Sequence, residues 1–189
     1  ENGLMEWIDG NVGAKVNMKY PACILNGRNA RGYCISVASA SYMQVQDAGA
    51  RMIHLAPNTK SNIISKSISA TGGNATYRGE VKIAKNAVNS YASVKCDTII
   101  LDSLSKSDTI PKNIVMNNSS LLEHEATISK IQDEQLFYLM SRGISEDKAK
   151  ELIVMGFVSA FRDELPVEYA VELNRLLSEN LNGGGTCVY

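Results

Sequence analysis

The spacing of polar and apolar residues changes near residue 122, and this change limits the folds that the chain can adopt. Before it, polar and apolar residues alternate in short segments such as 75–83 and 92–101, a pattern typical of strands with one buried face. Turn-forming residues separate these segments, as at Asn26 and Gly27. The absence of long helical patterns between strands argues against a doubly wound α/β fold. A sandwich, a barrel or a β-solenoid would each fit, and no strict repeat chooses among them.

Residues 133–181 instead space their apolar residues as helices do, and we expect three helices. The first should end at Gly143, and the second should begin after Ser145, an N-cap followed by acidic residues. Pro166 should start the third. The expected apolar faces consist of Leu136, Phe137, Leu139 and Met140, then of Ala149, Leu152, Ile153, Gly156, Phe157 and Ala160, and finally of Val167, Ala170, Val171, Leu173, Leu176 and Leu177.

The charge of the chain divides at the same junction. The net charge of −1 gives no general argument for binding nucleic acid or a membrane surface. Residues 1–122 hold 13 basic and 8 acidic residues, whereas residues 123–189 hold 6 basic and 12 acidic ones. An acidic helical end on a mildly basic β region suggests a surface for a partner protein, and a solvated helix face explains it equally well.

Composition narrows the class of protein further. No segment has the run of apolar residues that a membrane span needs, and we expect no signal peptide. Because the chain lacks an initiator methionine, we expect a fragment of a longer protein. The cysteines have no zinc-type spacing, so we expect reduced thiols in a cytoplasmic protein. They are Cys23, Cys34, Cys96 and Cys187.

Motifs of the common enzyme classes are missing. The sequence contains no phosphate-binding loop, no Gly-x-Ser-x-Gly elbow and no His-Glu-x-x-His motif. With two histidines, it has few options for a Ser-His-Asp arrangement. One of them, His54, is flanked by apolar residues and is expected to be a hydrogen-bonded core residue. We therefore do not expect a self-sufficient enzyme.

Two groups of residues could carry chemistry. Cys96 shares one side of its expected strand with Val94, so it is either a small buried residue or a soft thiolate ligand for iron or copper. Glu123, His124 and Glu125 would alternate along a strand, with both carboxylates on one face and the imidazole on the other. Such groups bind iron or zinc, although exposed charges beside a hydrogen-bonded histidine would give the same pattern.

Matching segments, in order along nearly the whole chain, carry a family resemblance. They are 5–21 (MEWIDGNVGAKVNMKYP), 46–59 (QDAGARMIHLAPNT), 65–69 (SKSIS), 77–79 (YRG), 96–97 (CD), 124–126 (HEA), 129–131 (SKI), 135–138 (QLFY), 142–143 (RG) and 156–157 (GF). On these residues the chain resembles the C-terminal part of the SufB family, the iron–sulfur cluster assembly scaffolds of the SUF system. The paralogous SufD proteins fit the QDAGA region less well.

The resemblance implies a mainly β fold. A right-handed parallel β-helix, truncated at its N-terminal end, would occupy residues 1–125, a small all-α domain residues 126–182, and a flexible tail residues 183–189. The helical domain would dock an ABC-type ATPase, SufC, on which ATP would be hydrolysed. The last strands would pair with a SufD-like subunit or with a second copy of this chain. The residues expected to dock the ATPase are Gln135, Phe137, Tyr138, Arg142 and Phe157.

The resemblance also implies a cluster site. Cys96 matches the cluster-building cysteine of the family, and Glu123, His124 and Glu125 match its candidate iron ligands. The cluster would be transient, either [2Fe–2S] or [4Fe–4S], with a sulfur donor and apoprotein acceptors as further partners. No nucleic acid or membrane partner is implied.

Three departures from the family pattern bear on this site. The family's N-terminal helical region and much of its β-helix are absent from the sequence. A second cysteine after the Cys-Asp pair is absent, and Ser103, Ser105 and Ser107 occupy that region. Residues 41–45 also lack the expected histidine. These departures argue against more than one thiolate ligand from this chain.

Three functions of different classes follow. The first is a non-enzymatic scaffold that holds a cluster. The second is a structural adaptor that binds the partner subunit and the ATPase without a cluster. The third, a carbohydrate-active β-helix enzyme, would need carboxylates clustered on an exposed sheet, whereas the acidic residues here concentrate in the helices.

Overall fold

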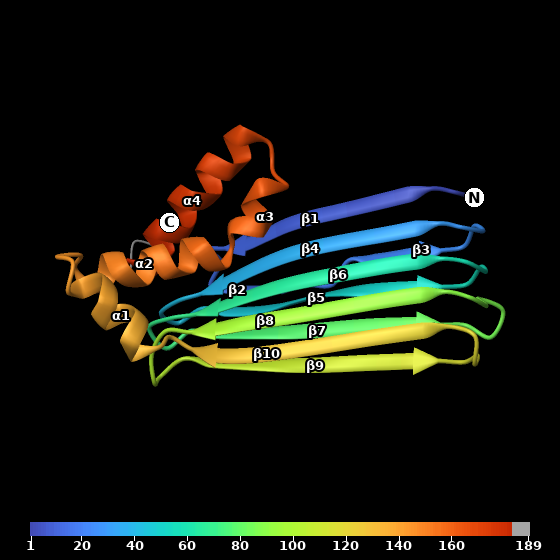
Figure 1. The fold of residues 1–189 in the computed structure, drawn as a ribbon, viewed down its shortest axis with the longest axis horizontal. Coiled ribbons are helices and arrows are strands. Elements are labelled where there is room, and N and C mark those ends of the chain that lie inside the picture. The colour runs from blue at the N-terminus through green and yellow to red at the C-terminus, as the bar shows by residue number, and fades with distance from the viewer. Residues whose placement is uncertain (183–189) are drawn as a thin grey trace.

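The computed structural model describes residues 1–182 as a parallel β-solenoid of about four turns followed by a short helical region (Figure 1). The prediction of a parallel β-helix followed by helices is therefore confirmed. The strands are β1 (Leu4–Val12), β2 (Val16–Lys19), β3 (Ala22–Leu25), β4 (Arg31–Ala40), β5 (Val45–His54), β6 (Lys60–Ser69), β7 (Asn74–Ile83), β8 (Tyr91–Ile100), β9 (Lys106–Val115) and β10 (Leu121–Lys130). The helices are α1 (Asp133–Met140), α2 (Glu146–Phe157), α3 (Ser159–Asp163) and α4 (Val167–Leu181). The expected flexible tail and Cys187 lie outside the described residues.

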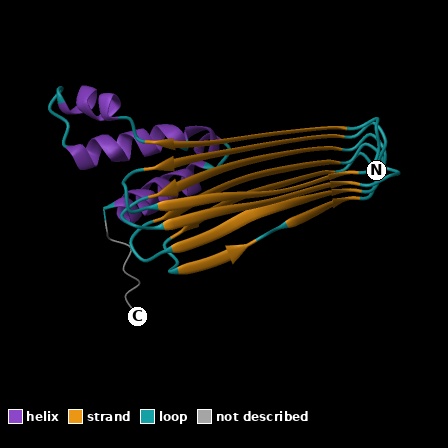
Figure 2. Ribbon diagram, turned by 90° about the horizontal axis from the view of Figure 1, so that it is seen from below, coloured by secondary structure: helices purple, strands orange, loops and turns teal. Residues whose placement is uncertain are grey.

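Two parallel sheets face each other along the solenoid (Figure 2). One sheet has the order β1-β4-β6-β8-β10, and the other has the order β2-β5-β7-β9, with β3 also paired to β5. Successive strands of a sheet pair without stagger, so that Ser36, Ser65 and Cys96 lie at one register position. Because side chains alternate between the two faces of a strand, each register position points either into the solenoid or outward in every turn.

The corner before each of the first four strands of the first sheet, β1, β4, β6 and β8, carries an asparagine in the left-handed conformation. Asn2, Asn29, Asn58 and Asn89 all have φ between 54° and 59°. Asparagine tolerates this conformation better than other residues with a side chain. The Asn29 amide also donates to the Oδ1 of Asn2 at 3.0 Å. These residues recur every 27 to 31 positions, which is a sequence signal of the repeat that the strand pattern alone did not provide.

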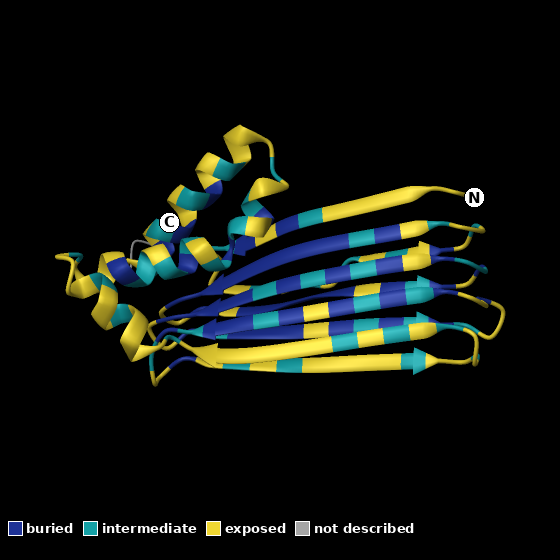
Figure 3. Cartoon of the chain, viewed as in Figure 1, coloured by how far each residue is buried: buried dark blue, intermediate teal, exposed yellow. Residues whose placement is uncertain are grey.

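Buried apolar residues form two cores. The first fills the solenoid between the sheets, with Ile63, Val81 and Val94 among its members. The second lies on the outer face of the first sheet, where α2, α3 and α4 cover the strands. In contrast, β9 and β10 are mostly exposed because they form the last turn (Figure 3).

The helices differ in part from the expected pattern. Ser145 is the N-cap of α2, Pro166 is the N-cap of α4, and Gly143 has the expected positive φ of 84°. A break at Val158, which the apolar spacing did not predict, separates α2 from α3. No helix among residues 1–182 combines the length and apolar character needed to cross a membrane.

Burial corrects the expected helix faces. Within α2 the buried residues are Ala149 and Val154, of which Val154 packs in the second core, whereas Leu152 is exposed. In α4 the face with Leu173 and Leu177 is buried. The expected face was too wide there, since Val167, Val171 and Leu176 are exposed. In α1 no residue is buried, so its apolar stripe remains open.

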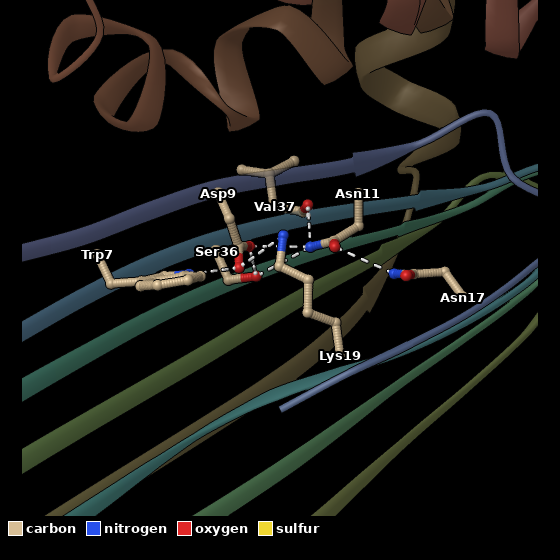
Figure 4. A network of polar contacts seen from close by, with 7 residues as sticks. All are labelled: Trp7, Asp9, Asn11, Asn17, Lys19, Ser36 and Val37. Carbon is tan, nitrogen blue, oxygen red and sulfur yellow. Dashed lines mark hydrogen bonds and ion pairs between the residues drawn. The ribbon is translucent and has the colours of Figure 1, made fainter. Parts of the chain in front are cut away.

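Two of the hydrogen-bonded groups of buried polar side chains lie near opposite ends of the strands. In the first turn, Asp9 accepts hydrogen bonds from Trp7, Asn11 and Ser36 and pairs with Lys19 at 3.1 Å (Figure 4). At the opposite end of the strands, both ring nitrogens of His54 lie 2.8 Å from hydroxyl groups. The prediction that His54 is a hydrogen-bonded core residue is confirmed.

Candidate functional site

Cys96 and His124 meet inside the solenoid at its last turn. Cys96 lies on β8, is 2% exposed and has its Sγ 3.7 Å from the Nε2 of His124. His124 lies on the neighbouring strand β10, where the register pairs Cys96 with Ala126. Residues 124 and 126 face the same side of β10, so the imidazole reaches the sulfur diagonally. A thiol and an imidazole are thus brought together by adjacent turns.

Asn113 fixes the orientation of the His124 ring. Its Nδ2 lies 3.1 Å from the Nδ1 of His124, which makes Nδ1 the acceptor and leaves the ring hydrogen on Nε2, facing the sulfur. Partial burial lowers the pKa of His124, which favours the neutral ring. A neutral imidazole is the form that binds a metal ion. For Nε2 to bind the metal ion, the ring hydrogen would have to be on Nδ1, and the side-chain amide of Asn113 would have to turn so that its oxygen accepts this hydrogen.

The carboxylates of Glu123 and Glu125 lie on the other face of β10. Glu123 accepts a hydrogen bond of 2.7 Å from the Tyr91 hydroxyl, and Glu125 lies 3.7 Å from the Nζ of Lys95. Side chains alternate between the two faces of the strand, as expected for this tripeptide, and this alternation separates the two carboxylates from the imidazole. Across residues 1–182, no three His, Cys, Asp or Glu side chains come together as a metal site would require.

Burial keeps the Cys96 thiol protonated in this state. Its pKa is raised to about 12, chiefly by burial, although interaction with Tyr77 lowers it. A thiol of this kind is inert toward weak electrophiles but can exchange its proton for a metal ion. Cys34 is a second buried thiol with a pKa raised to about 12 by burial, and Cys23 is partly buried. None of these three forms a disulfide.

Tyr77 belongs to the matching segment 77–79, but the sequence pattern gave it no role in the site. It lies on β7 in the opposite sheet and belongs to the same interior core as Cys96. Its hydroxyl is buried and has no hydrogen-bond partner in the described chain. A tyrosine at an inward position of a strand was the available signal, but only the fold shows that it faces Cys96.

Polar side chains line the interior at the register position of Cys96. Asp9, Ser36 and Ser65 occupy this position in the three preceding turns, and all three are buried. The signal in sequence is a small or polar residue recurring at one strand position, and it becomes visible only once the strands are aligned.

The last turn leaves the solenoid open. Within residues 1–182, β9 pairs only with β7 and β10 only with β8, so one edge of each strand is unpaired. Val115 and Ile128 occupy inward positions but are exposed, because no further turn covers them. Unpaired strand edges beside exposed apolar side chains are typical of sites where another chain adds strands.

A separate apolar groove lies between α1 and α2. It has a volume of about 510 Å³. Its lining residues are Glu134, Gln135, Tyr138, Leu139, Leu152, Ile153 and Gly156. Beside it, Phe137 is 73% exposed, and the Arg142 guanidinium lies 4.7 Å from the centre of the Tyr138 ring.

Phe157 does not share this surface. Its ring packs against the second core and lies 4.6 Å from the Nζ of Lys66 on β6. Four of the five expected docking residues, Gln135, Phe137, Tyr138 and Arg142, are therefore exposed on α1 and just after it. The fifth faces the solenoid.

Comparison with known proteins gives consistent matches. Residues 1–157 match the family described as SUF system FeS cluster assembly, SufBD core domain. The chain is 59% identical over 183 residues to the iron-sulfur cluster assembly protein SufB of Bacillus subtilis (strain 168). It is 58% identical to iron-sulfur cluster assembly SufBD family proteins of Staphylococcus epidermidis and Staphylococcus aureus. Each match covers 97% of this chain and 39% of the relative.

Proposed function

Because this chain belongs to the SufBD family of the SUF system for iron–sulfur cluster assembly, we propose that it provides part of a scaffold on which clusters are built and released. The contact between Cys96 and His124 is the observation that carries the proposal. It brings together a thiol, which would bind iron as a soft thiolate after losing its proton, and an imidazole at the open end of the solenoid. The chain itself supplies binding and no catalysis.

Sparse ligation suits a scaffold. Stable iron–sulfur sites are held by four thiolates, whereas a site with one thiolate and one imidazole leaves other iron positions for exchange. Glu123 and Glu125 point away from Cys96, so they would bind iron only from the outer face or after β10 has shifted. The assembled cluster, [2Fe–2S] or [4Fe–4S], is thus a substrate to be passed on to an apoprotein.

The open last turn supports a partner subunit. Unpaired edges of β9 and β10, with Val115 and Ile128 exposed between them, fit strand addition by a SufD-like subunit or a second copy of this chain. Such a partner would also close the interior around Cys96 and His124. Ligands from both subunits would then complete the site.

The helical region supports docking of an ABC-type ATPase. The groove between α1 and α2 is apolar and carries the exposed aromatic rings of Phe137 and Tyr138 at its border. Aromatic residues are enriched at the centres of protein interfaces. ATP hydrolysis on the docked partner would move the helices as a rigid body. The unpaired thiols of Cys23, Cys34 and Cys96 suit the reducing cytoplasm.

A structural adaptor is the second candidate. The lack of a cluster of three or more metal-binding side chains in residues 1–182 favours it. In that case the chain would hold the partner subunit and the ATPase without binding iron.

Anaerobic reconstitution with iron and sulfide, in the presence of the partner subunit, tests the two candidates. Wild type, Cys96→Ser and the control Cys34→Ser would be compared by bound iron and labile sulfide. Cluster loss in Cys96→Ser alone supports the scaffold. Equal occupancy in all three excludes Cys96 as a ligand, and no cluster in any sample with the partner bound favours the adaptor.

A further inference from the structure

The Tyr77 hydroxyl is an unsatisfied polar group in the middle of the solenoid. Tyr77 is 2% exposed, and its hydroxyl makes no hydrogen bond within residues 1–182. Tyr77 belongs to the apolar interior core, whose members include Ala50 and Val81. A phenylalanine would fill the same space without burying an unpaired hydroxyl, so packing alone does not explain a tyrosine here.

Gly79 lets the ring take its position. A side-chain carbon at residue 79 would lie 2.6 Å from the hydroxyl oxygen of Tyr77, closer than real contacts allow. Residues 77 and 79 face the same side of β7, so the tyrosine lies along its own strand over the glycine. The hydroxyl is thereby held at a fixed place instead of reaching a polar group at the surface.

The hydroxyl of Tyr77 faces the sulfur of Cys96. Tyr77 lies on one sheet and Cys96 on the other, and both point into the solenoid. Burial is the main cause that raises the pKa of the Tyr77 hydroxyl, and the thiol of Cys96 raises it more than the thiol of Cys34 does. A protonated thiol is a poor hydrogen-bond acceptor, which explains why the resting hydroxyl stays unpaired.

We propose that Tyr77 is a positioning residue that donates a hydrogen bond to the Cys96 sulfur when this sulfur bonds a metal ion. On binding, the S–H bond is replaced by an S–metal bond and the proton leaves to solvent. The sulfur then carries negative charge, and a hydrogen bond to a charged acceptor is stronger than one to a neutral acceptor. This inference rests on the proposed function in one respect, namely that Cys96 is a ligand.

Binding of Co²⁺ alone to the full chain under anaerobic conditions tests the inference. The sulfur-to-cobalt charge-transfer band that is present in wild type and absent in Cys96→Ser reports the metal on Cys96. Tyr77→Phe should bind Co²⁺ about 10- to 100-fold more weakly, as removal of a group that supports a ligand usually does. Its band should also move to lower energy, because a hydrogen bond stabilises the sulfur electrons.

Two further measurements separate this role from a structural one. The urea midpoint of Tyr77→Phe should equal or exceed that of wild type, since the lost hydroxyl had no partner. Tyr33→Phe, the same change on the outer face of β4, should leave affinity and band unchanged.

Each other outcome overturns the inference. A Tyr77→Phe variant with wild-type affinity and band would remove Tyr77 from the site while leaving Cys96 as a ligand. Weaker binding without a band shift, or a lowered urea midpoint, would assign the effect to packing. If wild type shows no band that depends on Cys96, both this inference and the proposed ligand fail.

Discussion

The ammonium group of Lys66 lies 4.6 Å from the centre of the Phe157 ring. The same Nζ lies 2.6 Å from a carboxylate oxygen of Asp97, the residue after Cys96. Lys66 and Asp97 are neighbours in register on the outer face of β6 and β8, and both are mostly buried. The last residue of α2 is therefore joined through one lysine to the strand that carries the candidate ligand.

This relationship predicts that Phe157 stabilises the attachment of the helices. Phe157→Ala should lower the free energy of unfolding by about 2 kcal/mol, less than a fully buried Phe→Ala change, because the ring is half-buried. Urea denaturation followed by circular dichroism measures this. Phe137→Ala, a change at an exposed ring, should stay within about 0.5 kcal/mol of wild type. An equal effect of both changes would contradict the assignment.

ATPase docking predicts a different response at Phe137. Phe137→Asp should weaken binding of the ABC-type ATPase at least about tenfold, because it replaces an exposed aromatic ring beside the apolar groove with a charge. Its urea midpoint should not change. Isothermal calorimetry measures the affinity, with Val167→Asp on the exposed face of α4 as a control. Undiminished binding by Phe137→Asp would exclude the exposed Phe137 ring from the docking surface.

The buried His54 predicts a loss of stability in mild acid. Burial lowers its pKa from 6.5 to about 4, so the unfolded chain takes up a proton at higher pH than the folded chain does. Its contribution is fully present above pH 6.5 and is lost as the pH falls toward 4. The total is about 3 kcal/mol, since each pKa unit corresponds to about 1.4 kcal/mol.

Urea midpoints between pH 7.5 and 4 check this prediction. Carboxylates and His124 contribute to the same range, so the comparison is made against His54→Gln, which lacks the titrating ring. The difference in stability between the two proteins should shrink steadily as the pH falls. Parallel profiles would show that His54 does not titrate on unfolding.

The glycine at position 49 predicts a strong effect of a single methyl group. A side-chain carbon there would overlap the carbonyl oxygen of Arg78 on the neighbouring strand. Gly49→Ala should therefore destabilise the chain by more than about 2 kcal/mol. Gly156→Ala is the matched control, because nothing lies within 4 Å of the added carbon and the helix gains about 0.5–1 kcal/mol. Thermal unfolding compares the two, and an unaffected Gly49→Ala would show that the strands can separate locally.

Local sequence patterns predicted the strands and helices better than they predicted the contacts between them. Alternation identified the strands around Cys96 and placed Glu123 and His124 on opposite faces, because a strand has a period of two. Helix caps at Ser145 and Pro166 were correct because their signals involve only neighbouring residues.

What the sequence pattern missed depends on residues far apart in the chain. The family resemblance placed Phe157 among the residues that dock the ATPase, yet its ring lies against Lys66, which is 91 positions earlier in the chain. The proximity of Tyr77 to Cys96 requires the distance between two sheets, which no local pattern contains. The solenoid itself was inferred from family resemblance, although the asparagines at Asn29, Asn58 and Asn89 record its turns.

The lengths of the turns show where this protein can accept change during evolution. Strands β4 to β10 all have ten residues, while the distance from one strand of a sheet to the next varies between 29 and 32. All of this variation therefore falls in the corners. A residue inserted at a corner leaves the strands intact, but one inserted within β8 before Cys96 would turn the sulfur to the outside. Insertions at the corners are therefore tolerated during evolution, whereas the site is kept only if the number of residues within each strand stays the same.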